Sequence, residues 1–72
     1  MENNEIKKEL YKQKPKATFL YIQNGVAVYT TLIIDFEDSG TFIKFEIPVT
    51  DMGEAKFEAL MDAKLLIRWL VK

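Results

Sequence analysis

The 72-residue chain contains few residues from which a catalytic centre could be built. It has no cysteine and no histidine, so it lacks thiolate nucleophiles, thiolate metal sites and the commonest general base. Its single serine, Ser39, lies between Asp38 and Gly40, a sequence typical of a turn. We therefore predict that the protein is not an enzyme and has no cofactor and no metal ion.

Two pairs of carboxylates could in principle perform acid-base chemistry or bind a hard cation. Glu37 and Asp38 precede a glycine in a turn, and Asp51 and Glu54 have the spacing of a capping box at the start of a helix. The three glycines are isolated, so no phosphate-binding glycine motif is present. Structural roles are the favoured interpretation of both pairs.

The acidic residues are concentrated in the second half of the chain. Residues 35–62 contain eight carboxylates and two lysines, whereas residues 1–16 contain five lysines and three glutamates. Within the acidic half, Glu54, Glu58 and Asp62 recur at helical spacing. We predict that these three form an acidic surface that steers a basic partner toward the protein.

The apolar content, 49%, predicts a folded chain, and 72 residues allow one domain with a thin core. No apolar stretch approaches the roughly 20 residues of a membrane span, and the N-terminus does not resemble a secretory signal. The expected location is the cytoplasm. Small domains without disulfides or metals often gain stability by association, so we expect a protein partner or a homodimer.

The N-terminal segment favours a helix. Residues 4–13 are good helix formers, with Asn4 as N-cap and with Ile6 and Leu10 on one side, and Pro15 ends the helix. We therefore divide the chain into residues 1–15, a short helix or a flexible arm, and residues 16–72, a single α+β domain.

Two β-rich runs, 17–23 and 26–36, flank Asn24-Gly25, which is the strongest short-range signal for a hairpin. A second turn at Glu37–Gly40 leads into a third strand, 41–49. These signals predict a three-stranded antiparallel meander.

After Asp51, the residues Phe57, Leu60 and Met61 recur at helical spacing and predict an amphipathic helix that packs on the sheet. Residues 65–71 are apolar on both faces apart from Arg68, which favours a C-terminal strand, parallel to its neighbour after a right-handed crossover. A helix stays open as the alternative for this segment. The predicted fold class is α+β: a three-stranded antiparallel meander plus a C-terminal strand, one amphipathic helix packed on the sheet, and a short N-terminal helix.

The two turns also predict the register. A two-residue first loop places Leu20 opposite Tyr29, and a second loop at 37–40 places Leu32 opposite Phe45. One face of the sheet then receives the helix. The other face is mixed, and its apolar residues are covered either by Ile6 and Leu10 or by another molecule. The apolar residues predicted to bind a partner on that face are Leu20, Ile22, Tyr29, Ile33 and Phe42.

These features predict a small non-enzymatic protein-binding module, such as an inhibitor, an adaptor or a regulatory accessory protein of the kind found in viruses. It would act through the apolar sheet face and the acidic surface. The alternative is single-stranded nucleic-acid binding by the aromatic sheet face together with the N-terminal lysines. The excess of carboxylates in residues 35–62 disfavours nucleic acid, and no membrane partner is expected. The identity of the partner is left open.

Overall fold

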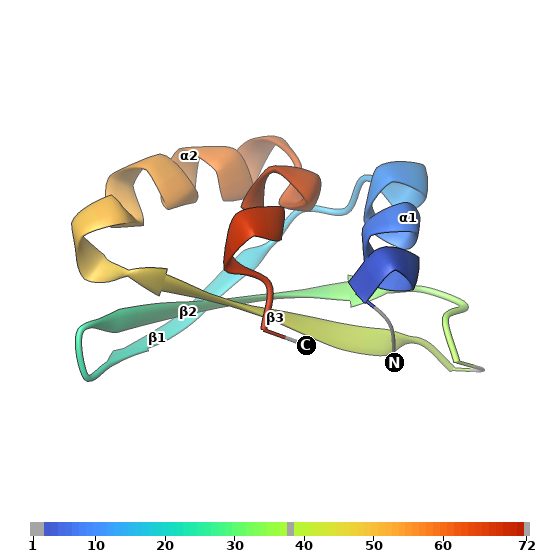
Figure 1. Cartoon of the computed structure of the whole chain (residues 1–72), viewed down its shortest axis with the longest axis horizontal. Helices are drawn as coiled ribbons and strands as arrows, with labels where there is room; N and C mark the ends of the chain where they lie inside the picture. The colour runs from blue at the N-terminus through green and yellow to red at the C-terminus, as the bar shows by residue number, and fades with distance from the viewer. Residues whose placement is uncertain (1–2, 38, 72) are drawn as a thin grey trace.

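A three-stranded antiparallel sheet in the order β1-β2-β3 forms one layer of the described chain, and the helical segments form a second layer on one of its faces (Figure 1). The computed structural model describes residues 3–37 and 39–71. The α+β class and the meander are therefore confirmed. In chain order the elements are α1 (Asn3–Gln13), β1 (Thr18–Gln23), β2 (Val26–Ile33), β3 (Thr41–Pro48), the 3-10 turn η1 (Val49–Asp51), α2 (Met52–Met61) and the 3-10 helix η2 (Ala63–Trp69).

The first hairpin forms at the predicted turn. Asn24 and Gly25 have φ values of 53° and 77°, as a two-residue turn of this type requires, and Gln23 pairs with Val26. The register then slips at a β-bulge between Phe19 and Tyr21, so that Phe19 and not Leu20 lies opposite Tyr29. The predicted pairing of Leu20 with Tyr29 is wrong because the bulge adds one residue to β1.

The second loop is longer than predicted. β2 ends at Ile33, and the backbone of Asp35 and Glu37 is left-handed, with φ values of 58° and 53°. The amide side chain of Gln13 donates to the Ile34 carbonyl oxygen (2.8 Å) and accepts from the Ile34 N–H (2.9 Å). This side chain therefore satisfies the backbone of Ile34 in place of a neighbouring strand. Asp38 of the predicted turn lies outside the described residues.

The longer loop shifts β3 by three residues relative to the prediction. Leu32 pairs with Phe42 and not with Phe45, and Tyr29 is the residue that pairs with Phe45. An odd shift exchanges the two faces of a strand. The predicted assignment of side chains to the two sheet faces is therefore wrong for β3 relative to β2.

The core lies between the sheet and the helical layer, on what we call the helix face. Ile6 and Leu10 of α1 are fully buried in the same cluster as Ala55 and Ala59 of α2, so the two helices share one face of the sheet (Figure 1). The alternative in which the N-terminal helix covers the opposite face is thus wrong. The rest of the cluster comprises Ala27, Tyr29, Ile33, Ile43, Phe45, Ile47, Ala63 and Leu66. The opposite face, called the open face, carries Tyr21, Val28, Thr30, Leu32, Phe42, Lys44 and Glu46.

Helix α2 packs with the side opposite to the one predicted. Its buried residues are Ala55 and Ala59, whereas Phe57, Leu60 and Met61 are exposed. The small alanine side chains let the helix backbone approach a core already filled by Phe45 and Leu66 of other elements. The prediction that the three large side chains pack on the sheet is therefore wrong.

The two predicted N-caps also differ from the structure. Asn4 lies within α1, which includes Asn3. Asp51 is the N-cap residue of α2, but its side chain makes no capping hydrogen bond to a described residue, and Glu54 instead bonds Arg68. No capping box forms, because Glu54 has a charged partner from another element.

The predicted parallel C-terminal strand does not form. Ala63–Trp69 is a 3-10 helix, and a single antiparallel bridge joins Leu70 to Phe45. The Val71 N–H also donates to the Lys44 carbonyl oxygen at 3.0 Å. The buried side chain of Leu66 holds η2 against the core, and Leu70 and Val71 cover the outer edge of β3 at Lys44 and Phe45.

Two glycines provide a matched test of the second loop. Gly40 has φ 109°, and a Cβ atom built on it would lie 3.0 Å from the Ile33 carbonyl oxygen, whereas a Cβ on Gly53 in α2 meets no described atom within 4 Å. Gly40→Ala should lower the free energy of unfolding by about 1–2 kcal/mol, because an L residue is strained there. Gly53→Ala should raise it by about 0.5–1 kcal/mol. Urea unfolding curves of the two variants measure the difference, and equal effects would contradict the loop geometry.

Candidate functional site

A group of large apolar side chains is exposed along β1 and the adjoining side of α2. We call it the β1–α2 surface, and its members are between 44% and 66% exposed: Phe19, Leu20, Ile22, Phe57, Leu60 and Met61. Phe57, Leu60 and Met61 share one side of α2, and Leu60 lines a hollow together with Phe19 of β1. Large exposed apolar patches on soluble monomers usually mark a binding site. The β1–α2 surface is therefore the candidate functional site.

A hollow of about 320 Å³ joins the two halves of this surface. Its walls include Phe19 from β1 and Leu60 from α2, with Tyr29 and Ala59 among the other lining residues. Backbone hydrogen bonds near the hollow tie the chain before β1 to the end of α2 and to the start of η2. The Ala17 N–H donates to the Ala59 carbonyl oxygen (3.2 Å), and the Ala63 N–H donates to that of Pro15 (2.7 Å).

Strand β1 is an open edge of the sheet. One side pairs with β2, and no described strand pairs with its other side. All six residues of β1 are exposed, and the sequence Thr18–Gln23 contains neither a charged residue nor a proline. Proteins usually protect such edges with lysine, proline or a covering segment, as the chain end covers β3. A bulge between Phe19 and Tyr21 interrupts the regular backbone of this edge at one position.

Tyr29 lies beneath the β1–α2 surface. Its ring packs edge-on against Phe19, with 5.5 Å between the ring centroids. Its hydroxyl is buried and has no hydrogen-bond partner among the described residues. Burial raises the pKa of the Tyr29 phenol above its ordinary value, because the charged phenolate would lose its hydration.

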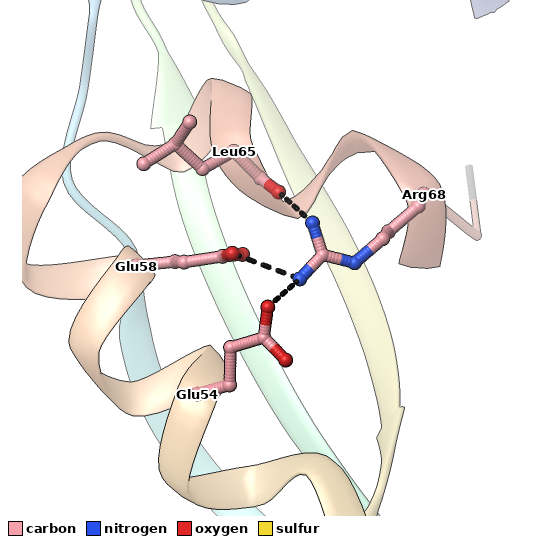
Figure 2. A network of polar contacts seen from close by, with 4 residues as sticks. All are labelled: Glu54, Glu58, Leu65 and Arg68. Carbon is pink, nitrogen blue, oxygen red and sulfur yellow. Dashed lines mark hydrogen bonds and ion pairs between the residues drawn. The ribbon is translucent and has the colours of Figure 1, made fainter.

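The side of α2 that faces η2 carries a charge network (Figure 2). The Arg68 guanidinium donates from Nη2 to Glu54 (2.9 Å) and to Glu58 (2.8 Å), and from Nη1 to the Leu65 carbonyl oxygen (3.2 Å). The guanidinium also lies over the Trp69 ring, 3.8 Å from its centroid. The hydrogen bond to Glu58 is the main cause that raises the pKa of Arg68. This network ties η2 to α2.

The predicted acidic surface is therefore largely occupied by contacts within the chain. The side chain of Glu58 is only 14% exposed and is paired with Arg68, which also pairs with Glu54. Asp62 accepts from the Lys64 N–H (3.0 Å) and lies 3.8 Å from the Lys64 ammonium. The sequence did not predict these pairings, because it assigned residues 65–71, which contain Arg68, to a strand. Steering of a basic partner by the three carboxylates stays a prediction.

The five residues predicted to bind a partner do not share one surface. Leu20 and Ile22 belong to the β1–α2 surface, whereas Phe42 is exposed on the open face. Tyr29 and Ile33 are buried in the core, because the register places them on the helix face. The prediction of one face containing all five is wrong.

The sequence prediction missed Phe57, Leu60 and Met61 as surface residues. A signal was present: Met52, Ala55 and Ala59 also recur at helical spacing and form a second apolar stripe on α2. Packing of that stripe exposes the larger side chains. Because Phe and Leu are more hydrophobic than Ala, the sequence favours the side of the helix with Phe57 and Leu60 as the buried side.

The described residues contain no cluster of three or more His, Cys, Asp or Glu side chains that could hold a metal ion. None of the helices described is long and apolar enough to cross a membrane.

A second hollow, of about 220 Å³, lies on the open face and is lined by Tyr21, Gln23, Asn24, Val26, Val28 and Glu46. No protein-family model, curated protein or solved structure matches the chain.

The orphaned hydroxyl of Tyr29 yields a stability prediction. Tyr29→Phe should raise the free energy of unfolding by about 1 kcal/mol, because it removes a buried polar group that has no partner. In the wild type, the phenol of the unfolded chain ionises near pH 10, before that of the folded chain. The contribution of the Tyr29 phenol to the free energy of unfolding is therefore constant below pH 10, and it is lost as the pH rises through the raised pKa of the folded state.

Urea unfolding between neutral and alkaline pH measures both effects, with Tyr11→Phe as the control at a phenol ring that is 55% exposed. Tyr29→Phe should flatten the alkaline loss of stability. An alkaline loss equal to that of the wild type would show that the Tyr29 hydroxyl is not buried as described.

A second prediction concerns the charge network. Arg68→Gln should lower the melting temperature, since it leaves the little-exposed Glu58 carboxylate without its positive partner. Lys56→Gln removes a positive charge from an exposed site on α2, the helix that carries Glu58, but outside this network. It should change the melting temperature less. Equal shifts in thermal unfolding would mean that Arg68 does not hold η2 in place.

Proposed function

We propose that the protein is a small non-enzymatic protein-binding module and that its interface is the β1–α2 surface. The observation that carries the proposal is the exposure of six large apolar side chains beside an unprotected edge strand. An edge strand offers backbone hydrogen bonds to a partner, and apolar side chains next to it supply burial. An inhibitor, an adaptor or a regulatory accessory protein would use such a surface.

The size of the surface supports this proposal. With about 200 Å² for a fully exposed side chain of this size, the six exposed fractions amount to roughly 650 Å². A stable protein interface buries about 800 Å² on each partner. The side chains thus supply most of the required area, and the backbone edge of β1 can supply the remainder.

Charge contributes less to the proposal than apolar burial. Arg68 pairs with Glu54 and Glu58, and Lys64 pairs with Asp62, so the negative charges are offset within the chain. The side chain of Glu54 is 63% exposed and that of Glu58 is 14% exposed. Steering of a basic partner is accordingly left out of the proposed mechanism. A cytoplasmic location stays part of the proposal, supported by a composition without cysteine.

Nucleic-acid binding is less well supported. Tyr29 is buried and unavailable for base stacking, which leaves Tyr21 and Phe42 as exposed aromatics of the open face. The lysines of α1 belong to the helical layer, on the other side of the sheet (Figure 1). A groove that combines stacking with positive charge would need both on one side.

Site-specific photo-cross-linking in the cells that produce the chain tests the proposal. A photo-reactive residue in place of Leu60 should give a discrete cross-linked protein band, whether the partner is another protein or a second copy. Phe42 is the matched control, because it is equally exposed at 66% but lies on the open face. Adding Leu20→Lys to the Leu60 variant should remove the band.

Equal cross-linking yields from positions 60 and 42 would contradict the proposal. So would an unchanged band after Leu20→Lys in a chain that remains folded, since a charge on the edge strand opposes strand addition.

A further inference from the structure

We propose that the partner of β1 is β1 of a second copy of the chain, paired antiparallel about a two-fold axis. This inference rests on the proposed function and names the occupant of the same surface. The two sheets would then join into one continuous sheet of six strands, with both helical layers on the same side. Three features of β1 carry the inference: its faces, its lack of charge and its apolar neighbours.

The first feature is the distribution of β1 side chains between the two faces. Phe19 pairs with Tyr29 and Ile22 pairs with Ala27, so both belong to the helix face. Thr18 and Gln23, whose partners on β2 are Thr30 and Val26, belong to the open face. Read inward from either end, β1 therefore begins with a residue on the open face, Thr18 or Gln23, followed by a residue on the helix face, Phe19 or Ile22.

Full antiparallel overlap of two copies of β1 places Thr18 opposite Gln23 of the second copy and Phe19 opposite Ile22 of the second copy. Directly opposed residues of an antiparallel pair must lie on the same face. Both pairs meet this condition. The third pair, Leu20 opposite Tyr21 of the second copy, lies at the bulge beside the two-fold axis, where Leu20 has no partner on β2 that assigns it to a face.

The bulge is what makes full overlap possible. In a regular strand, residues three or five positions apart lie on opposite faces, so a six-residue strand cannot pair fully with its own copy. The extra residue at Leu20 changes this parity and brings Phe19 and Ile22 to one face. The same irregularity that interrupts the β1–β2 register thus makes the four outer residues of β1, Thr18, Phe19, Ile22 and Gln23, complementary to those of a second copy.

The second feature is the absence of charge, and the third is the apolar surroundings. Thr18–Gln23 has no charged residue that would repel its own copy across the axis. On the helix face, Phe19 and Leu60 line the hollow beside β1, and the proposed pairing places Phe19 of each copy against Ile22 of the other. The side-chain area of roughly 650 Å² approaches what each partner of a standard interface buries.

Sedimentation velocity of the purified full chain over a wide concentration range tests the occupant. The wild type should sediment as a dimer, and Ile22→Lys should raise the dimer dissociation constant by about a hundredfold or more, because it places a lysine against Phe19 of the second copy. Leu20→Lys serves as a second edge variant if Ile22→Lys does not fold. Phe42→Lys, on the open face, is the matched control and should remain dimeric.

Engineered cysteines test the register, since the natural chain has none. Thr18→Cys and Gln23→Cys, mixed under mild oxidation, should form a disulfide-linked heterodimer, because opposed Cα atoms lie about 5 Å apart. Either variant alone should form none, since its two cysteines would be about 17 Å apart along the paired strands.

A wild type that stays monomeric at all concentrations overturns the inference. If position 60 nevertheless cross-links to a different protein, the proposed function stands and only the second copy is rejected. A dimer that gives no disulfide in the mixture, or one that Phe42→Lys dissociates as readily as Ile22→Lys, also overturns it. A wild-type dimer, together with a disulfide that forms only when Thr18→Cys and Gln23→Cys are mixed, would support the antiparallel pairing of the two β1 strands.

Discussion

The register between β2 and β3 determines which side chains enter the core, and the Gln13 side chain bonds the backbone of Ile34 just after β2 ends. These two hydrogen bonds satisfy both backbone polar groups of Ile34, and the loop that follows is longer than predicted and ends where β3 begins at Thr41. The resulting register places Tyr29 opposite Phe45 and turns both toward the helices. A loop shorter by three residues would direct the opposite face of β3 into the core. The identity of the buried side chains thus depends on the length of the loop between β2 and β3.

The core that this register creates is filled without the large side chains of α2. Phe45, Leu66 and the two buried residues of α1 occupy the space, and α2 contributes Ala55 and Ala59. Close approach of the helix then leaves Phe57, Leu60 and Met61 outside. The apolar surface beside β1 is therefore a consequence of how the core is packed, and the open strand edge next to it presents backbone groups that no described strand pairs with.

Much of the local structure was predictable. The Asn24-Gly25 hairpin, the three strands, the helix with Ile6 and Leu10 on one side, and the helix after Asp51 all follow from turn chemistry and periodicity. Two of the five predicted binding residues, Leu20 and Ile22, lie in the candidate site. Tyr29 and Ile33 were misplaced because the bulge and the loop each change a register that alternates with every residue. The charge network was missed because Arg68 reaches Glu54 and Glu58 only when its segment is helical.

By itself, then, the sequence determined the kinds of elements and their order, because these depend on interactions between residues close together in the chain. It also determined the lack of cysteine and histidine and the surplus of apolar residues. The tertiary structure alone decided which apolar residues form the surface. That choice depends on contacts between distant residues, such as Gln13 with Ile34, and on competition among side chains for a core too small to hold them all.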